Sequence, residues 1–282
     1  MNQNQYYFCV AGLFKNEAST LQEWIEHYIF HGAQHIFLLN DKSTDNFIDV
    51  LTPYLQNNIV TLIHVDEPYY QGRQKNIYNK YLLPLLNQKI MKWLFICDID
   101  EFLWSSREID LKNILKYTEH IGQIQIDCNL FGSNGLEKQP KYIVPNFTRR
   151  DAYPENFIAR NYKYIINSNF QFKNLGVHTA YFENEEYMKN QCFQRIDYSS
   201  DTKQPWFILN HYYVQSKDFW TKIKMTRGDS DHCRERTIQN FFDANKDTNQ
   251  IEDLGLFLQN KILYDKLMME HNCSIDTRIE LS

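Results

Sequence analysis

One stretch of the sequence indicates both a fold and a site: Trp93-Leu94-Phe95-Ile96-Cys97-Asp98-Ile99-Asp100-Glu101-Phe102-Leu103. An apolar run typical of a central strand ends in Asp98 and Asp100, which project to the same face of an extended chain. Two carboxylates this close raise each other's pKa unless a cation lies between them. Oxygen ligands at an open strand end suit Mg²⁺ or Mn²⁺, and Mg²⁺ in such sites also binds substrate phosphates. The stretch therefore predicts a metal–diphosphate site, with two acids that only cap a strand as the simpler alternative.

The sequence before this stretch alternates between strand and helix patterns. Apolar runs predict strands, and apolar residues spaced i, i+3, i+4 and i+7 predict helices. The predicted strands cover residues 6–13, 35–40, 59–64 and 93–98, and the predicted helices cover residues 21–30, 43–55 and 74–86. Strands and helices that alternate at this spacing form a parallel sheet with helices on both faces. We therefore expect an α/β fold with a mostly parallel central sheet.

Local signals set the ends of two of these helices. Thr20 and Glu23 have the spacing of a capping box, and Gly32 follows the same helix as a stop signal. Pro84 is expected to kink or shorten the helix at 74–86, because proline cannot donate a backbone hydrogen bond.

Polar side chains follow each predicted strand of the first half. They occupy residues 14–17, 40–45, 64–67 and 98–101. Ligands of open parallel sheets bind at the carboxyl ends of the strands, where these segments should gather. This clustering favours a ligand site over simple strand capping by Asp98 and Asp100.

The pattern changes after about residue 122. A strand predicted at 124–127 is followed by two strand-like segments that contain histidines, 175–178 with His178 and 207–212 with His211. Helices are expected near residues 216–227, 234–245 and 251–270. We find no repeat and no linker, so residues 1–282 are interpreted as one domain.

Composition and charge argue against several classes of protein. The net charge of -5 disfavours a nucleic-acid-binding protein, which would carry a basic face. The six cysteines lie far apart without a Cys-x-x-Cys pair, which favours reduced, packed thiols over disulfides or a zinc site. The sequence lacks a leader-like N-terminal pattern and a window of about 18 uninterrupted apolar residues. We therefore expect a cytoplasmic protein with at most peripheral contact with the inner face of a membrane.

Seven short motifs, taken in order, resemble those of GT-A glycosyltransferases of family 92 and the related family-2-like group. They are Lys15-Asn16-Glu17, Glu23-Trp24-Ile25-Glu26-His27, Asn40-Asp41-Lys42-Ser43-Thr44-Asp45, Asp98-Ile99-Asp100-Glu101-Phe102, Phe131-Gly132-Ser133-Asn134-Gly135, Gly176-Val177-His178, and Asn210-His211-Tyr212 followed by Ser216 and Lys222. Each motif alone is weak, whereas the ordered set, which extends from about residue 6 to 228, is specific to the group.

This resemblance implies a GT-A fold and a hexosyltransferase-type activity. The donor would be a nucleotide sugar, expected to be a UDP-sugar, and the sugar would pass with inversion to a hydroxyl of a glycan acceptor. The acceptor would be lipid-linked, protein-linked or a free saccharide. Residues 1–122 would form the half that binds the nucleotide sugar, and residues 123–282 the acceptor-side half with the C-terminal helices.

The resemblance and the strand-end pattern together suggest site residues. Mn²⁺ or Mg²⁺ would be held by Asp98, Asp100 and His211. The nucleotide sugar would be contacted by Phe14, Asn16, Glu17, Asp41, Ser43, Gln74, Asn76, Asp98, Ile99 and Lys222. The base that takes the acceptor's proton is expected in the second half, with Asp229 and Asp231 as candidates. For these two acids a merely solvated loop, and for residues 74–76 an ordinary solvated helix N-terminus, stay open as alternatives.

Other classes of protein carry related patterns. A haloacid-dehalogenase-type phosphatase has its Asp-x-Asp after the first strand, whereas Asp98 follows the fourth predicted strand. A sugar-nucleotide pyrophosphorylase opens with a glycine-rich, arginine-containing loop, which Ala11-Gly12-Leu13-Phe14-Lys15 is not. A non-catalytic module of the same fold that binds a sugar nucleotide or a glycan stays as the alternative to an enzyme.

Overall fold

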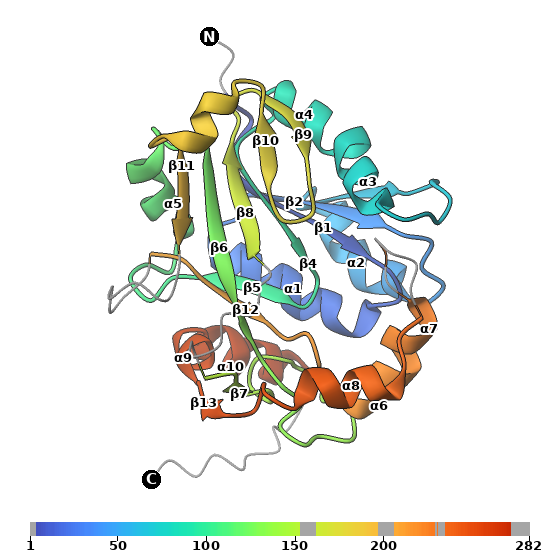
Figure 1. Ribbon diagram of the computed structural model, residues 1–282. Coiled ribbons are helices and arrows are strands. Elements are labelled where there is room, and N and C mark those ends of the chain that lie inside the picture. Colours follow the sequence, from blue (N-terminus) through green and yellow to red (C-terminus); the bar gives the residue numbers. More distant parts are fainter. Residues whose placement is uncertain (1–3, 153–161, 197–205, 229, 231–234, 272–282) are drawn as a thin grey trace.

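A parallel sheet with alternating helices forms the first half of the chain in the computed structural model, which describes residues 4–152, 162–196, 206–228, 230 and 235–271 (Figure 1). The elements are β1 (Tyr6–Phe14), α1 (Ala18–Phe30), β2 (His35–Asn40), α2 (Phe47–Gln56), β3 (Val60–His64), α3 (Arg73–Tyr81), α4 (Leu83–Asn87) and β4 (Met91–Asp98). All neighbouring strands pair in parallel, in the order β3-β2-β1-β4. The predicted strands and their parallel arrangement are confirmed.

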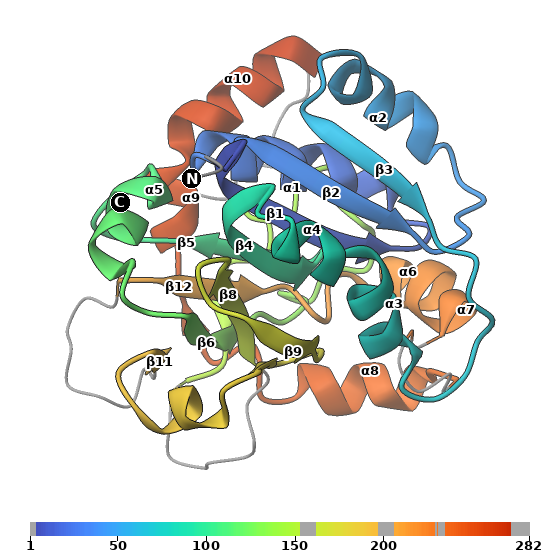
Figure 2. The ribbon, with the colours of Figure 1, turned by 90° about the horizontal axis from the view of Figure 1, so that it is seen from above.

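Alternate residues of β1 enter two separate hydrophobic cores. Phe8 and Val10 pack in the core that α1, α2 and α10 (Lys261–His271) cover, and Cys9 and Ala11 pack in the core that α3 and α4 cover. Figure 2 shows these two groups of helices on opposite sides of the sheet. Strands buried on both faces read as continuous apolar runs, which explains the run that precedes Asp98. The predicted layers, with helices on both faces, are confirmed.

The start of α1 differs from the start that the local sequence predicts. The helix begins at Ala18 without a side-chain cap, so the capping box predicted from Thr20 and Glu23 is wrong. The Thr20 hydroxyl donates to a backbone carbonyl, and the Glu23 carboxylate accepts hydrogen bonds from the backbone N–H groups of residues 143–144. The predicted stop is confirmed, because Gly32 follows the helix with a φ of 90°.

The other two helices of this half also begin or end elsewhere than the simple pattern suggests. α2 begins at Phe47 rather than near residue 43, after a turn that the polar segment 40–45 forms. The helix predicted at 74–86 is interrupted at Leu82, two residues before Pro84, and continues as the separate helix α4. The break confirms the expected effect of proline.

The chain after β4 adds strands to the same sheet. They are β5 (Glu101–Trp104), β6 (Gln123–Leu130), β8 (Tyr162–Asn167), β11 (Phe193–Ile196) and β12 (Ile208–His211). β8 lies antiparallel between β4 and β6, and β12 pairs with β6 in parallel and with β5 in antiparallel fashion. The sequence patterns missed β5, β8 and β11. The segment predicted as a strand at 175–178 is instead a strand end at Leu175 followed by a loop.

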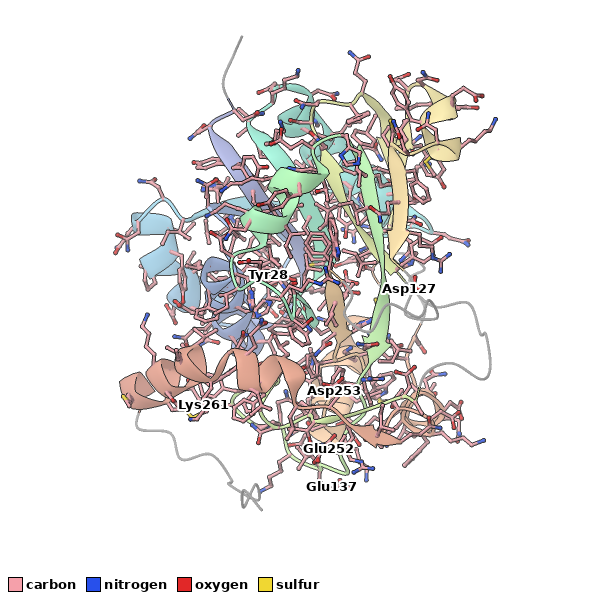
Figure 3. The ribbon with its side chains drawn as sticks, turned by 90° about the vertical axis from the view of Figure 1, so that its left-hand side faces the viewer. Tyr28, Asp127, Glu137, Glu252, Asp253 and Lys261 are labelled. Carbon is pink, nitrogen blue, oxygen red and sulfur yellow. The ribbon has the colours of Figure 1, made fainter. Side chains whose placement is uncertain are left out.

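Short elements and helices complete the described chain. The short elements are α5 (Leu111–Leu115), the 3₁₀ turns Lys116–Thr118 and Glu185–Lys189, and the strands β7 (Arg149–Arg150), β9 (Phe172–Leu175), β10 (Ala180–Phe182) and β13 (Ile251–Glu252). The late helices are α6 (Lys217–Phe219), a π-helical turn Trp220–Lys224, α7 (Met225–Arg227), α8 (Ile238–Asn245), α9 (Gly255–Gln259) and α10. Figure 3 shows α10, which begins at Lys261, lying along the lower part of the molecule beside α1. No helix within the described ranges has both the length and the apolar character needed to cross a membrane.

The cysteines of the described chain are free thiols. Cys9, Cys97 and Cys128 are buried and Cys192 is half-buried. Packed thiols, rather than a disulfide framework, are therefore confirmed for these four residues. Cys233 and Cys273 lie outside the described residues.

Candidate active site

The carboxyl ends of the parallel strands open onto a cavity of about 500 Å³. α6, α7 and α8 lie across from these strand ends (Figure 1). The predicted site residues that line the cavity are Phe14, Glu17, Asp41, Gln74, Asp98, Asp100 and His211, and His178 lines it as well. The structure thus brings together the acid pair, the end of β2 and the end of β12 at the edge where the sequence predicts a site.

A buried lysine lies beside each acid of the pair. Asp98 ends β4, its side chain is 38% exposed, and its Oδ2 lies 2.8 Å from the Lys163 Nζ. Asp100 is buried, with its Oδ2 2.7 Å from the Lys224 Nζ. Burial alone would raise the pKa of both carboxyls, but the adjacent ammonium groups hold the pKa of Asp98 below, and that of Asp100 well below, its usual value. Both acids are therefore ionised, and the cations that separate them come from the protein itself.

The two lysines come from elements that the sequence patterns did not assign to the site. Lys163 lies on β8, is 1% exposed, and also lies 3.5 Å from a Glu101 oxygen. Lys224 ends the π-helical turn, and its Nζ also donates to the Tyr213 carbonyl. Burial lowers the pKa of Lys224 to about 8, although the Asp100 charge beside it acts in the opposite direction.

His211 stands between the two acids that follow β4. Its Nε2 lies 3.3 Å from the Asp100 Oδ1, and its Nδ1 lies 3.5 Å from the Glu101 Oε1. The His211 Nδ1 and the Glu101 Oε1 are both buried and have no hydrogen-bond partner in the described chain. Burial raises the pKa of Glu101 to about 7, and the two carboxylates raise the pKa of His211 against the effect of its own burial.

Two of the three predicted metal ligands are placed to hold one ion. Neighbouring ligands of an ion with bonds of about 2.1 Å lie about 3 Å apart, which matches the 3.3 Å between Asp100 and His211. Among the described acids, histidines and cysteines, the set whose ligand atoms lie within 4.8 Å of one another is Glu101, Cys128 and His211. Neither Asp98 nor Asp100 is part of this set, although both line the same cavity. The separation of Asp100 and His211 suits a shared divalent cation, and the ion itself stays a prediction.

Asp41 at the end of β2 already has a strong partner. Its two carboxylate oxygens accept hydrogen bonds of 2.9 and 2.7 Å from the Arg73 guanidinium, and both side chains are buried. The Tyr69 ring lies 4.4 Å from the centre of this guanidinium. The nucleoside contact predicted for Asp41 stays a prediction, and the structure adds Arg73 as the residue that fixes the carboxylate.

Five predicted donor-binding residues do not line the cavity, so their contacts with the donor stay predictions. Asn16 and Ser43 instead tie the loops after β1 and β2 together, through a 3.0 Å hydrogen bond from the Asn16 N–H to the Ser43 hydroxyl. Asn76 donates to the Tyr70 hydroxyl, and Ile99 is buried in the hydrophobic core. The Lys222 side chain is 69% exposed and pairs with Asp218 on its own helical segment.

The region after the π-helical turn closes the other side of the cavity. Arg227 pairs with the buried Glu17 at 2.6 Å and donates to the carbonyl of Lys15. Burial raises the pKa of Glu17 in spite of this ion pair. Gly228 and Ser230 line the cavity, and the Ser230 hydroxyl lies 3.2 Å from the Gln74 Oε1. The predicted bases Asp229 and Asp231 lie outside the described residues.

The profile of Glycosyltransferase family 92 matches residues 4–240. The chain belongs to glycosyltransferase family 92. This confirms the resemblance inferred from the motifs, and together with the parallel sheet it confirms the predicted GT-A type of fold.

Named relatives of this family 92 chain share part of its sequence. A family 92 protein of Oryza sativa subsp. japonica is 26% identical over 151 residues, which is 52% of this chain and 25% of that protein. A galactan beta-1,4-galactosyltransferase of Arabidopsis thaliana is 27% identical over 179 residues, which is 55% of this chain and 36% of that protein. The match thus spans between 25% and 36% of these relatives' own length.

Solved structures resemble the chain more distantly. S. aureus TarS 1–349 in complex with UDP-GlcNAc has a TM-score of 0.42 and 10% identity, covering 95% of this chain and 73% of that chain. HddC from Yersinia pseudotuberculosis has a TM-score of 0.32 and 13% identity, covering 75% of this chain and 91% of that chain.

Four basic residues at or behind the cavity of this family 92 chain were not predicted as site residues. They are Arg73, Lys163, Lys224 and Arg236. The sequence contained a weak signal for a site residue only in the case of Lys224. Residues two apart on a helical segment point to nearly opposite sides, so only one of Lys222 and Lys224 could face the cavity. For Lys163 no local signal existed, since a lysine between two tyrosines in a strand reads as a solvent-facing residue.

Proposed function

We propose that this family 92 chain transfers a sugar from a nucleotide-sugar donor to a hydroxyl of a glycan acceptor, with inversion at the anomeric carbon. The observation that carries the proposal is one cavity that acidic and basic side chains line together. The acids include Asp98 and Asp100, and the basic residues are Lys15, Lys224, Arg227 and Arg236. Such a cavity can hold a diphosphate against cationic groups while leaving a carboxylate for proton transfer.

The reaction requires one bond to form as another breaks. The acceptor oxygen attacks the anomeric carbon from the side opposite the diphosphate, and the bond between that carbon and the diphosphate oxygen breaks with its electron pair. The acceptor's proton passes to a carboxylate. We propose Asp229 or Asp231 as this base, because they adjoin Gly228 and Ser230, which line the cavity. Holding both substrates in one cavity supplies much of the remaining acceleration.

We also propose Mn²⁺ or Mg²⁺ as a cofactor held by Asp100 and His211, with Asp98. The 3.3 Å separation of the first two supports this, and so does Glu101 beside the His211 Nδ1. A histidine that binds a metal usually directs its other ring nitrogen to a carboxylate or carbonyl. When bound, the ion would offset the negative charge of the departing diphosphate.

The donor and acceptor classes rest on the relatives and on the motifs. We propose a UDP-sugar as donor and hexosyl transfer to a glycan, in keeping with the relative named as a galactan galactosyltransferase. The acceptor would be lipid-linked, protein-linked or a free saccharide. A cytoplasmic location with at most peripheral membrane contact is part of the same proposal. Cell fractionation tests it: release of the protein by salt supports it, and retention in membranes after a carbonate wash contradicts it.

A nucleotide-release assay tests the proposed activity. The chain is incubated with a panel of UDP-sugars and oligosaccharide acceptors, including galactan fragments, in the presence of Mn²⁺. We expect acceptor-dependent release of UDP, loss of that release in Asp100→Asn, and wild-type rates in the exposed control Lys189→Gln. UDP binding without release under any condition would favour the non-catalytic binding module. The absence of both UDP binding and UDP release would overturn the proposal.

A further inference from the structure

Two cationic side chains of the cavity share the same aromatic wall. The Lys224 Nζ lies 4.4 Å from the centre of the Tyr213 ring and 5.9 Å from that of Trp220. The centre of the Arg236 guanidinium lies 5.7 Å and 6.0 Å from the same two rings. Like charges gathered in a partly dehydrated space repel each other unless anions compensate them.

The two cations differ in how they are compensated. Lys224 has the Asp100 carboxylate at 2.7 Å, and Arg227 nearby has Glu17 at 2.6 Å. Arg236 forms no ion pair with any carboxylate of the described residues, and its Nη1 is buried without a hydrogen-bond partner there. A guanidinium held against aromatic rings at the edge of a cavity, with a donor unused, is poised to bind an anion.

We propose that Arg236 binds the distal phosphate of the donor's diphosphate, the phosphate that carries the sugar. This inference rests on the proposed function. Arg236 lies against the same two aromatic rings as Lys224, which contacts Asp100, whereas the nucleoside is expected at Asp41. The planar guanidinium can donate two parallel hydrogen bonds to phosphate oxygens, which a lysine cannot. Arg236 then holds the leaving group while its bond to the sugar breaks.

Comparison of nucleotides with and without the distal phosphate tests this assignment. The affinities of UDP and UMP are measured by calorimetry at a fixed Mn²⁺ concentration for the whole chain, for Arg236→Gln, for Arg236→Lys and for the exposed control Lys189→Gln. We expect Arg236→Gln to weaken UDP binding by roughly tenfold or more and to change UMP binding by less than about twofold. Arg236→Lys should fall between wild type and Arg236→Gln, and the control should match wild type.

The outcomes separate this inference from the function on which it rests. Equal affinity of wild type and Arg236→Gln for UDP would overturn the role of Arg236 alone. Equal losses for UDP and UMP would also overturn it, because the defect would then not depend on the distal phosphate. A wild-type chain that binds neither nucleotide would overturn the proposed function and this inference with it. Inorganic pyrophosphate, added as a competitor, should bind wild type more tightly than Arg236→Gln whatever the donor base is.

Discussion

At the scale of single residues, two buried lysines lower the pKa values of the acid pair. Lys163 contacts both Asp98 and Glu101, and Lys224 contacts Asp100. The acids could be predicted from the sequence because they end an apolar strand, and so could His211, which ends another. Lys163 could not, because its burial depends on β8 lying between β4 and β6, strands that are distant in the sequence.

Replacing Lys163 by methionine tests its part in stability. Lys163→Met should lower the free energy of unfolding by about 3 kcal/mol, since it leaves the buried Glu101 and the partly exposed Asp98 without their countercharge. Urea denaturation at pH 7 measures the change. The matched control is Lys80→Met, whose ammonium is 58% exposed beside Glu67 and whose loss should cost less than about 1 kcal/mol. Equal, small effects of both variants would contradict the role assigned to Lys163.

Substitutions in the acid pair should have similar effects on activity and different effects on stability. Asp98→Asn and Asp100→Asn should each abolish sugar transfer, because each removes a proposed metal or diphosphate contact. Asp100→Asn should be the more destabilising, since it leaves Lys224 buried and unpaired, whereas the Asp98 side chain is 38% exposed. Nucleotide release and thermal unfolding check the two expectations. Transfer at the wild-type rate by either variant would exclude that acid from the site.

A single carboxylate joins three segments at the scale of elements. Glu23 on α1 accepts hydrogen bonds from the backbone N–H groups of Ile143 at 2.5 Å and Val144 at 2.9 Å, and from the Tyr264 hydroxyl of α10 at 2.7 Å. The local pattern assigned Glu23 to a capping box. Sequence spacing shows only neighbours within a few turns, so contacts this distant could not be predicted, although the helix itself could.

Glu23 should make stability depend on pH. Burial raises the pKa of Glu23 to about 7 in the folded protein, against an ordinary value of 4.5. Between these values the folded protein keeps a proton that the unfolded chain has released, so this contribution to stability is lost as the pH rises. The free energy of unfolding of Glu23→Gln, taken relative to that of wild type, should therefore rise by on the order of 2–3 kcal/mol between pH 5 and pH 8. Urea denaturation at both values measures this, with Glu137→Gln as the exposed control, and a constant difference between variant and wild type would contradict it.

The site joins the two halves of the chain at the scale of the whole molecule. Arg227 pairs with Glu17, Lys224 pairs with Asp100, and Ser230 contacts Gln74, so each contact links the parallel half to the late helices. The fold of the parallel half was predictable because its strands are continuous apolar runs that alternate with helices. The fold of the second half was less predictable because its strands pair out of chain order.

Donor binding across this junction should stabilise the entire fold. A ligand at 100 times its Kd adds about 2.7 kcal/mol to the free energy of unfolding, which corresponds to a rise in Tm of roughly 5 °C for a chain of this size. We expect UDP with Mn²⁺ to produce this rise in a thermal-unfolding assay, and EDTA to remove most of it, because Asp100 and His211 are proposed to hold the ion. Asp100→Asn should show little rise, whereas Lys189→Gln, exposed and outside the cavity lining, should behave as wild type. An equal rise in Tm in excess EDTA would show that donor binding does not need the metal. An equal rise in Tm with UDP in Asp100→Asn would show that the nucleotide binds elsewhere on the molecule.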